Sequence, residues 1–66
     1  MYMLVDEPTG SGPTKQAFDA IDDAFGTDEF SEGQATTAIM NSLGCEASEA
    51  GNLFDQLRRN DCISEV

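Results

Sequence analysis

Apolar side chains recur at helical spacing near the end of the chain, and this spacing limits the fold more than any other feature. Ala50, Leu53, Phe54 and Leu57 stand at i, i+3, i+4 and i+7, which places them on one face of an α-helix. Such a helix, expected over about 47–60, has to bury that face against other elements. The chain is therefore expected to fold as a packed helical domain.

A first helix is predicted from Thr14 to Phe25. Phe18, Ile21 and Phe25 stand at i, i+3 and i+7, and the acidic residues between them lie off this apolar stripe. Thr14 is the expected N-terminal cap, and Gly26 is the expected left-handed stop. The pattern indicates an amphipathic helix with an acidic outer face.

A second helix is predicted after Phe30. The segment from Ser31 to Gln34 has the form of a capping box, in which each of the two side chains bonds to the backbone of the other residue. The helix is expected to run to about Leu43 and to stop at Gly44. Its buried face would be formed by Ala35, Ile39 and Leu43.

Both ends of the chain favour short strands, Met1–Val5 and Cys62–Val66, while the prolines and glycines of residues 6–13 predict a loop. We therefore expect an α+β fold, mostly α, in the order strand, three helices, strand (βαααβ). It would form a single domain over residues 1–66, with the two strands paired. The expected core consists of Phe18, Ile21, Phe25, Ile39, Leu43, Leu53, Phe54 and Leu57.

The charge is strongly negative, with 13 carboxylates against 3 cations and a net charge of −10. An acidic excess together with depletion of lysine and histidine resembles the proteins of extreme halophiles, although an ordinary acidic protein has the same net charge. At about 1 M salt the Debye length is about 3 Å, so this self-repulsion would be screened. In dilute buffer it would oppose compaction. We therefore expect a halophilic protein whose folding depends on salt.

Composition argues against several function classes. No apolar run reaches the roughly 18–20 residues that span a membrane, and Met1–Val5 lacks the basic flank and length of a secretory signal. The chain has no histidine and only 2 cysteines, and the carboxylates of residues 22–32 lack the spacing of an EF-hand. We expect a cytoplasmic protein with no enzyme activity, no cofactor, no metal site and no membrane partner.

The cysteines admit two interpretations. Cys45 and Cys62 are expected to act as small apolar residues, one at the turn between helices and one on the last strand. The alternative is a redox pair, if the fold brings the two thiols together. The sequence favours the structural role, because no cation-rich setting is evident around either thiol.

The second half of the chain resembles the winged-helix type of helix-turn-helix domain. This family places a short strand before its second helix, a tight turn before its third, and an apolar strand after it. The matching residues are Phe30-Ser31, Gln34-Ala35, Ile39, Leu43-Gly44-Cys45, Glu49-Ala50, Leu53-Phe54, Leu57, Asn60-Asp61 and Cys62-Ile63. One departure is large, since the family continues into a β-hairpin wing. The resemblance therefore implies a truncated winged-helix-like domain in which Met1–Val5 supplies the missing strand.

The resemblance implies two kinds of partner. In the family, the outer face of the third helix enters the DNA major groove while basic residues hold the phosphates. The corresponding candidate interaction face is Ser48, Asn52, Asp55, Gln56, Arg58 and Arg59. Because 3 cations cannot supply the usual phosphate contacts, we favour another protein or self-association as the partner, in association with transcription. Direct DNA binding by a transcriptional regulator through residues 47–60 is the alternative. Met1, Tyr2 and Met3, if they lie at a sheet edge, offer a partner a strand to pair with.

Overall fold

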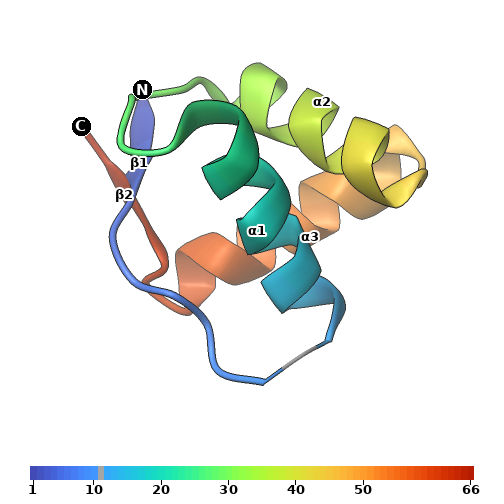
Figure 1. Ribbon diagram of the computed structural model, residues 1–66, viewed down its shortest axis with the longest axis horizontal. Coiled ribbons are helices and arrows are strands. Elements are labelled where there is room, and N and C mark those ends of the chain that lie inside the picture. The colour runs from blue at the N-terminus through green and yellow to red at the C-terminus, as the bar shows by residue number, and fades with distance from the viewer. Residues whose placement is uncertain (11) are drawn as a thin grey trace.

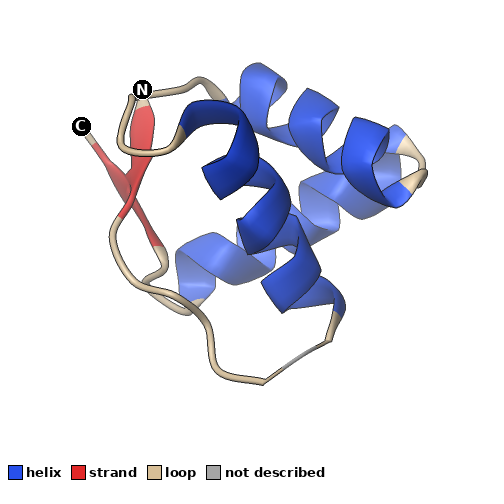
Figure 2. Cartoon of the chain, viewed as in Figure 1, coloured by secondary structure: helices blue, strands red, loops and turns tan. Residues whose placement is uncertain are grey.

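The chain forms three helices between two short terminal strands (Figures 1 and 2). The computed structural model describes residues 1–10 and 12–66. The mostly helical α+β arrangement with a strand at each end confirms the fold class expected from the sequence. The elements, in chain order, are β1 (Tyr2–Leu4), α1 (Pro13–Phe25), α2 (Glu32–Leu43), α3 (Ala47–Arg59) and β2 (Ile63–Glu65).

The N-cap of α1 lies two residues earlier than predicted. Gly12 is the N-cap and makes no side-chain cap bond, while Pro13 occupies the first turn, where its missing N–H costs nothing. The prediction of Thr14 as the cap was wrong. Its hydroxyl instead donates to Oε1 of Gln56 on α3 at 2.9 Å. Gly26 ends the helix with a φ of 59°. The expected loop over 6–13 therefore ends at residue 12, and it includes Ser11, which lies outside the described residues.

Helix α2 begins and ends as predicted. The backbone N–H of Gln34 donates to Oγ of Ser31 at 3.1 Å, and the N–H of Ser31 donates to Oε1 of Gln34 at 2.8 Å. This is a complete capping box. Gly44 ends the helix in the left-handed conformation, with φ 69° and ψ 28°, and its N–H donates to the carbonyl of Met40. The turn leads into α3.

Replacing Gly44 with alanine should lower the free energy of unfolding by about 1–2 kcal/mol, because a Cβ is disfavoured in the left-handed region. A Cβ at Gly44 meets no atom within 4 Å, so backbone strain is the only cost. Gly51 in α3 is the matched control. It also has open space around the added Cβ, and Gly51→Ala should stabilise the helix by about 0.5–1 kcal/mol. Urea denaturation of both variants measures the two effects, and equal stabilities would contradict the assigned turn.

Helix α3 buries the predicted apolar stripe, since Ala50, Leu53, Phe54 and Leu57 are all buried. Asn60 forms its C-cap. Beyond it the chain turns sharply at Asp61, which has a φ of 60°, a conformation that aspartate tolerates better than most residues. The turn is closed by the N–H of Cys62, which donates to the carbonyl of Leu57 at 2.9 Å. This turn directs β2 back towards the start of the chain.

The terminal strands pair antiparallel, which confirms the pairing expected from the sequence. The register joins Tyr2 to Glu65, Met3 to Ser64 and Leu4 to Ile63. The other edge of β1 meets the segment before α2: Tyr2 and Phe30 exchange backbone hydrogen bonds of 2.7 and 2.9 Å. Strand β1 therefore lies between the Phe30 bridge and β2, and both ends of the chain lie on the same side of the molecule (Figure 1).

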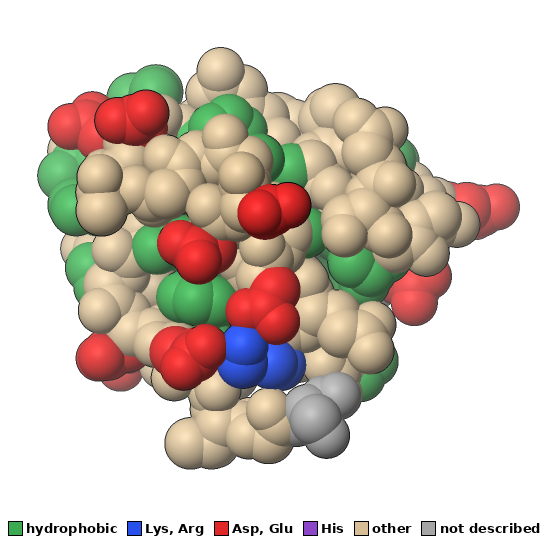
Figure 3. All heavy atoms as spheres, in the orientation of Figure 1, with side chains coloured by type: hydrophobic (Ala, Val, Ile, Leu, Met, Phe, Trp, Pro, Cys, Tyr) green, Lys and Arg blue, Asp and Glu red, His purple; other side chains and the backbone are tan. Residues whose placement is uncertain are grey.

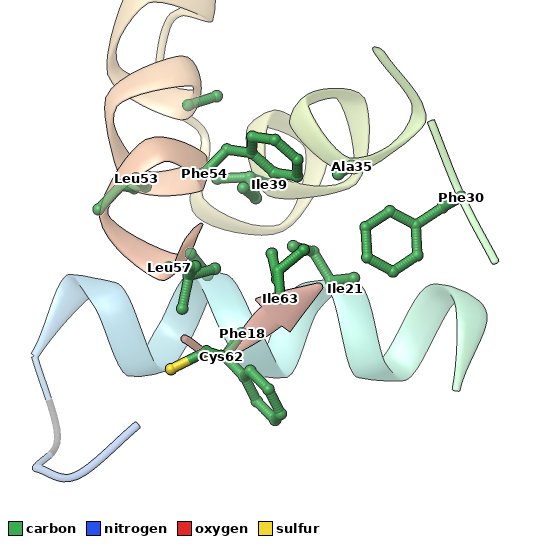
Figure 4. Close-up of a cluster of buried hydrophobic side chains, with 12 residues drawn as sticks. Phe18, Ile21, Phe30, Ala35, Ile39, Leu53, Phe54, Leu57, Cys62 and Ile63 are labelled. Atoms are coloured by element: carbon green, nitrogen blue, oxygen red, sulfur yellow. The ribbon is translucent and has the colours of Figure 1, made fainter. Parts of the chain in front are cut away.

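The core lies where the three helices meet the strands (Figure 4). Six of the eight predicted core residues are buried, but Phe25 and Leu43 are only partly buried and pack at its margin. The prediction also missed Phe30, Cys62 and Ile63, which are buried. Phe30 lies in the isolated bridge before α2, and Cys62 and Ile63 lie at the start of β2, so helical periodicity could not identify them. Tyr2 adds an edge-to-face contact with Phe54, with ring centroids 5.2 Å apart.

Candidate interaction surfaces

The outer face of α3 is where the sequence predicted it. Ser48, Asn52, Gln56, Arg58 and Arg59 are exposed, and Asp55 is partly exposed. The reason is the buried stripe, which orients the helix and directs the intervening positions to solvent. The six candidate residues therefore belong to one helix surface, although several are engaged within the chain.

The two arginines of α3 have intramolecular contacts. Nε of Arg59 lies 2.9 Å from Oδ2 of Asp55, one helical turn earlier. The guanidinium of Arg58 lies over the ring of Tyr2, 5.1 Å from its centroid, in a cation–π contact. Gln56 accepts the hydrogen bond from Thr14 described above. These contacts hold the three side chains against other groups of the chain.

Lys15 is also paired. Its Nζ lies 2.6 Å from Oδ1 of Asp19 and 2.8 Å from Oε1 of Glu7. Hydrogen bonding to Asp19, and then to Glu7, raises the pKa of Lys15 above its ordinary value. Acidic side chains dominate the charged groups on the face shown in Figure 3. All 3 cationic side chains of the chain thus contact a carboxylate or an aromatic ring.

An apolar surface lies on the outer face of the strand pair, which we define by Met1, Met3, Val5 and Val66. Tyr2 packs on the core, as does Leu4, so the alternate residues of β1 point the other way. Met1 is 52%, Val5 50% and Val66 60% exposed, and these are the large hydrophobic side chains that are exposed among the described residues. Figure 3 shows hydrophobic side chains (green) along the left edge of the molecule, where the strand pair lies in Figure 1.

Strand β2 has an open edge. Val5 donates to the carbonyl of Cys62 and Val66 to that of Met1, both at 2.9 Å. In an antiparallel ladder, residues that bond to the neighbouring strand alternate with residues that do not. Because Cys62 and Val66 bond to the residues next to β1, the N–H and C=O groups of Ile63 and Glu65 point away from β1. Within residues 1–10 and 12–66, no backbone hydrogen bond joins these groups to another segment. The sequence predicted that residues 1–3 would lie at a free sheet edge. This prediction was wrong, because β1 lies between the Phe30 bridge and β2.

A depression runs beside this edge, between β2 and the end of α3. Its lining residues are Asp55, Arg58, Arg59, Ile63, Ser64 and Glu65. A second depression, between the end of α1 and α2, has a mostly small and uncharged lining that includes Ala24, Gly33 and Ala38. Of these two, the first lies beside the open strand edge and has both cationic and acidic side chains in its lining, so it offers a partner hydrogen bonds and charged groups.

Cys45 and Cys62 do not form a redox pair. Cys45 precedes α3 and Cys62 follows it, and a helix of 13 residues is about 20 Å long. A disulfide requires Cα atoms within about 7 Å, and both thiols are free. Burial, followed by the nearby charges of Asp6 and Asp61, raises the pKa of Cys62. Both cysteines pack with the core, as their structural role predicts.

Among the described residues, no group of at least three histidine, cysteine, aspartate or glutamate side chains is placed to hold a metal ion. No helix in that part of the chain has the length and apolar character needed to cross a membrane. Comparisons with family models, curated proteins and solved structures found no match to this chain.

Proposed function

We propose that this protein is a small, non-enzymatic, winged-helix-like module of the cytoplasm that acts by binding another protein or a second copy, in association with transcription. The observation behind the proposal is the outer face of the strand pair. The exposed large hydrophobic side chains among the described residues gather there instead of being scattered singly, and clustered exposed apolar residues mark interaction sites.

The arrangement of the strands supports the winged-helix element of the proposal. Phe30, in the bridge to Tyr2, stands directly before α2, where the family has its short strand. Strand β2 follows α3, and β1 lies beside it in place of a second wing strand. Fold alone does not select a partner, so the proposal depends on the chemistry of the surface.

DNA binding has weaker support. Asn52 is exposed on α3, and asparagine is a competent reader of adenine. However, affinity for DNA comes largely from cations that displace counterions. Arg58 and Arg59 are two of only 3 cations, Arg59 is paired with Asp55, and the net charge of −10 repels phosphate. A protein partner is therefore the better supported alternative.

Site-specific photo-crosslinking tests the proposal. A benzophenone amino acid would replace Val5 on the outer face, Asn52 on α3, or Asp22 on the acidic face of α1, all of which are exposed. After irradiation of cells, we expect protein adducts from position 5, because an apolar surface is covered by its partner. Position 22 is the matched control and should give none.

The outcomes separate the two candidate functions. Protein adducts at position 5 that are absent at position 22 would support a protein partner. Nucleic-acid adducts from position 52, with no protein adduct at position 5, would instead support a DNA-binding regulator. Equal adducts at positions 5 and 22 would mean that the outer face has no particular role.

A further inference from the structure

We infer that two copies of this chain associate through the open edges of β2, which pair antiparallel about a two-fold axis at Ser64. This inference rests on the proposed function, because it names a second copy as a partner and gives its surface. The result is a continuous sheet in the order β1-β2-β2-β1, with the same surface used by both copies, as two-fold symmetry requires.

The backbone selects this register. Only Ile63 and Glu65 direct their N–H and C=O groups to the open edge of β2. With the axis at Ser64, Ile63 of each copy faces Glu65 of the other, so every edge-directed group of the strand is paired. An axis at Ile63 would place Glu65 opposite Asp61, whose φ of 60° is incompatible with a strand. The Ser64 register therefore makes the most hydrogen bonds.

The charges favour a second copy in this register. Glu65 lies on the same sheet face as Tyr2, which is the face that packs on α3. In the dimer, the Glu65 side chain of one copy therefore enters the depression beside Ile63 of the other copy. Arg58 and Arg59 line that depression together with the carboxylates of Asp55 and Glu65, and Arg59 is already paired with Asp55. Among the described residues, Arg58 has no carboxylate within salt-bridge distance, since its contact is with the Tyr2 ring. Glu65 of the second copy supplies the missing anion twice, once on each side of the axis.

The strength of association follows from its size and charge. Strand β2 has only 3 residues, so the contact is small and belongs to the weak, transient class. Each copy also has a net charge of −10, and the two repel each other in dilute buffer. Salt shortens the range of this repulsion. We therefore expect monomers at low ionic strength and a monomer–dimer equilibrium in molar KCl.

Sedimentation equilibrium in molar KCl, over a wide range of protein concentration, measures the association. The first variant is Glu65→Pro. The N–H of Glu65 points away from β1, so proline removes a donor from the open edge while leaving the pairing with β1 intact. Association should weaken at least about tenfold, because each copy loses the N–H donor and the carboxylate of Glu65. Circular dichroism checks that the helices are retained.

A charge exchange provides the sharper test. Glu65→Arg should prevent self-association by placing arginine against Arg58, and Arg58→Glu should prevent it by placing glutamate against Glu65. Mixing the two variants restores opposite charges on both sides of the axis, so the mixture should form a heterodimer although neither variant self-associates. Asp22→Arg on the acidic face of α1 is the control, and it should retain wild-type self-association or strengthen it.

The inference is overturned if the wild-type chain stays monomeric in molar KCl, if Glu65→Pro dimerises as well as wild type, or if the mixed variants do not associate. Photo-crosslinking distinguishes this failure from failure of the proposed function. A monomeric chain that still gives a protein adduct of different mass at position 5 would retain the interaction function and lose only the second copy as its partner.

Discussion

Phe30→Ala should lower the free energy of unfolding by about 3–5 kcal/mol. Phe30 has no exposed surface and stacks on Phe25, with ring centroids 5.3 Å apart and an interplanar angle of 23°. The expected stability of a chain this short is only about 3–10 kcal/mol. Alanine would leave a cavity between α1, α2 and the strand pair, so the loss should be a large fraction of the total stability.

Phe25→Ala is the matched control, because Phe25 is the other ring of the stacked pair but is only partly buried. Its removal should cost about half as much, since part of its surface is already in water. Urea denaturation followed by circular dichroism measures both variants. If Phe25→Ala proved as damaging as Phe30→Ala, the burial difference between the two rings would not govern stability.

Salt should stabilise the wild-type fold. Two unit charges 10 Å apart in water repel by about 0.4 kcal/mol, and a net charge of −10 sums many such pairs. Raising KCl from a few millimolar to about 1 M screens them, so we expect several kcal/mol of stabilisation. The melting temperature should then rise by at least about 10 °C, with a recovery of helical circular dichroism. The surface ion pairs that salt weakens contribute little in comparison.

A charge-reduced variant separates screening from other effects of salt. Asp22, Asp23 and Asp28 are exposed and take no part in the ion pairs of the described residues. Converting all three to asparagine should raise the melting temperature in dilute buffer and flatten its dependence on KCl. A wild-type chain with full helicity and an unchanged melting temperature in salt-free buffer would contradict the predicted halophilic behaviour.

The helices could be predicted because their signals are local. The stripe from Ala50 to Leu57, the capping box at Ser31 and the left-handed Gly44 each reflect contacts within a few residues along the chain. Thr14 shows where such reasoning fails. Its residue type suits a cap, but Pro13 already opens the helix, and the Thr14 hydroxyl bonds to α3 across the molecule.

The candidate site was predictable in part. The exposed positions of α3 followed from its buried stripe, but their partners did not. Arg58 lies over Tyr2, and this contact exists only because residues from opposite ends of the chain meet. The open edge of β2 depended on the same long-range pairing, since the Phe30 bridge to Tyr2 makes β1 the inner strand.

By itself, the sequence determined the three helices, their buried faces, the strand tendency of both ends and the negative charge of the surface. Each of these depends on the residue types or on spacing within a few turns. Only the tertiary structure decided that Phe30 is central to the core, that Cys45 and Cys62 lie apart, and that β2 presents the free edge. Those outcomes depend on which distant segments meet, and local periodicity does not encode that choice.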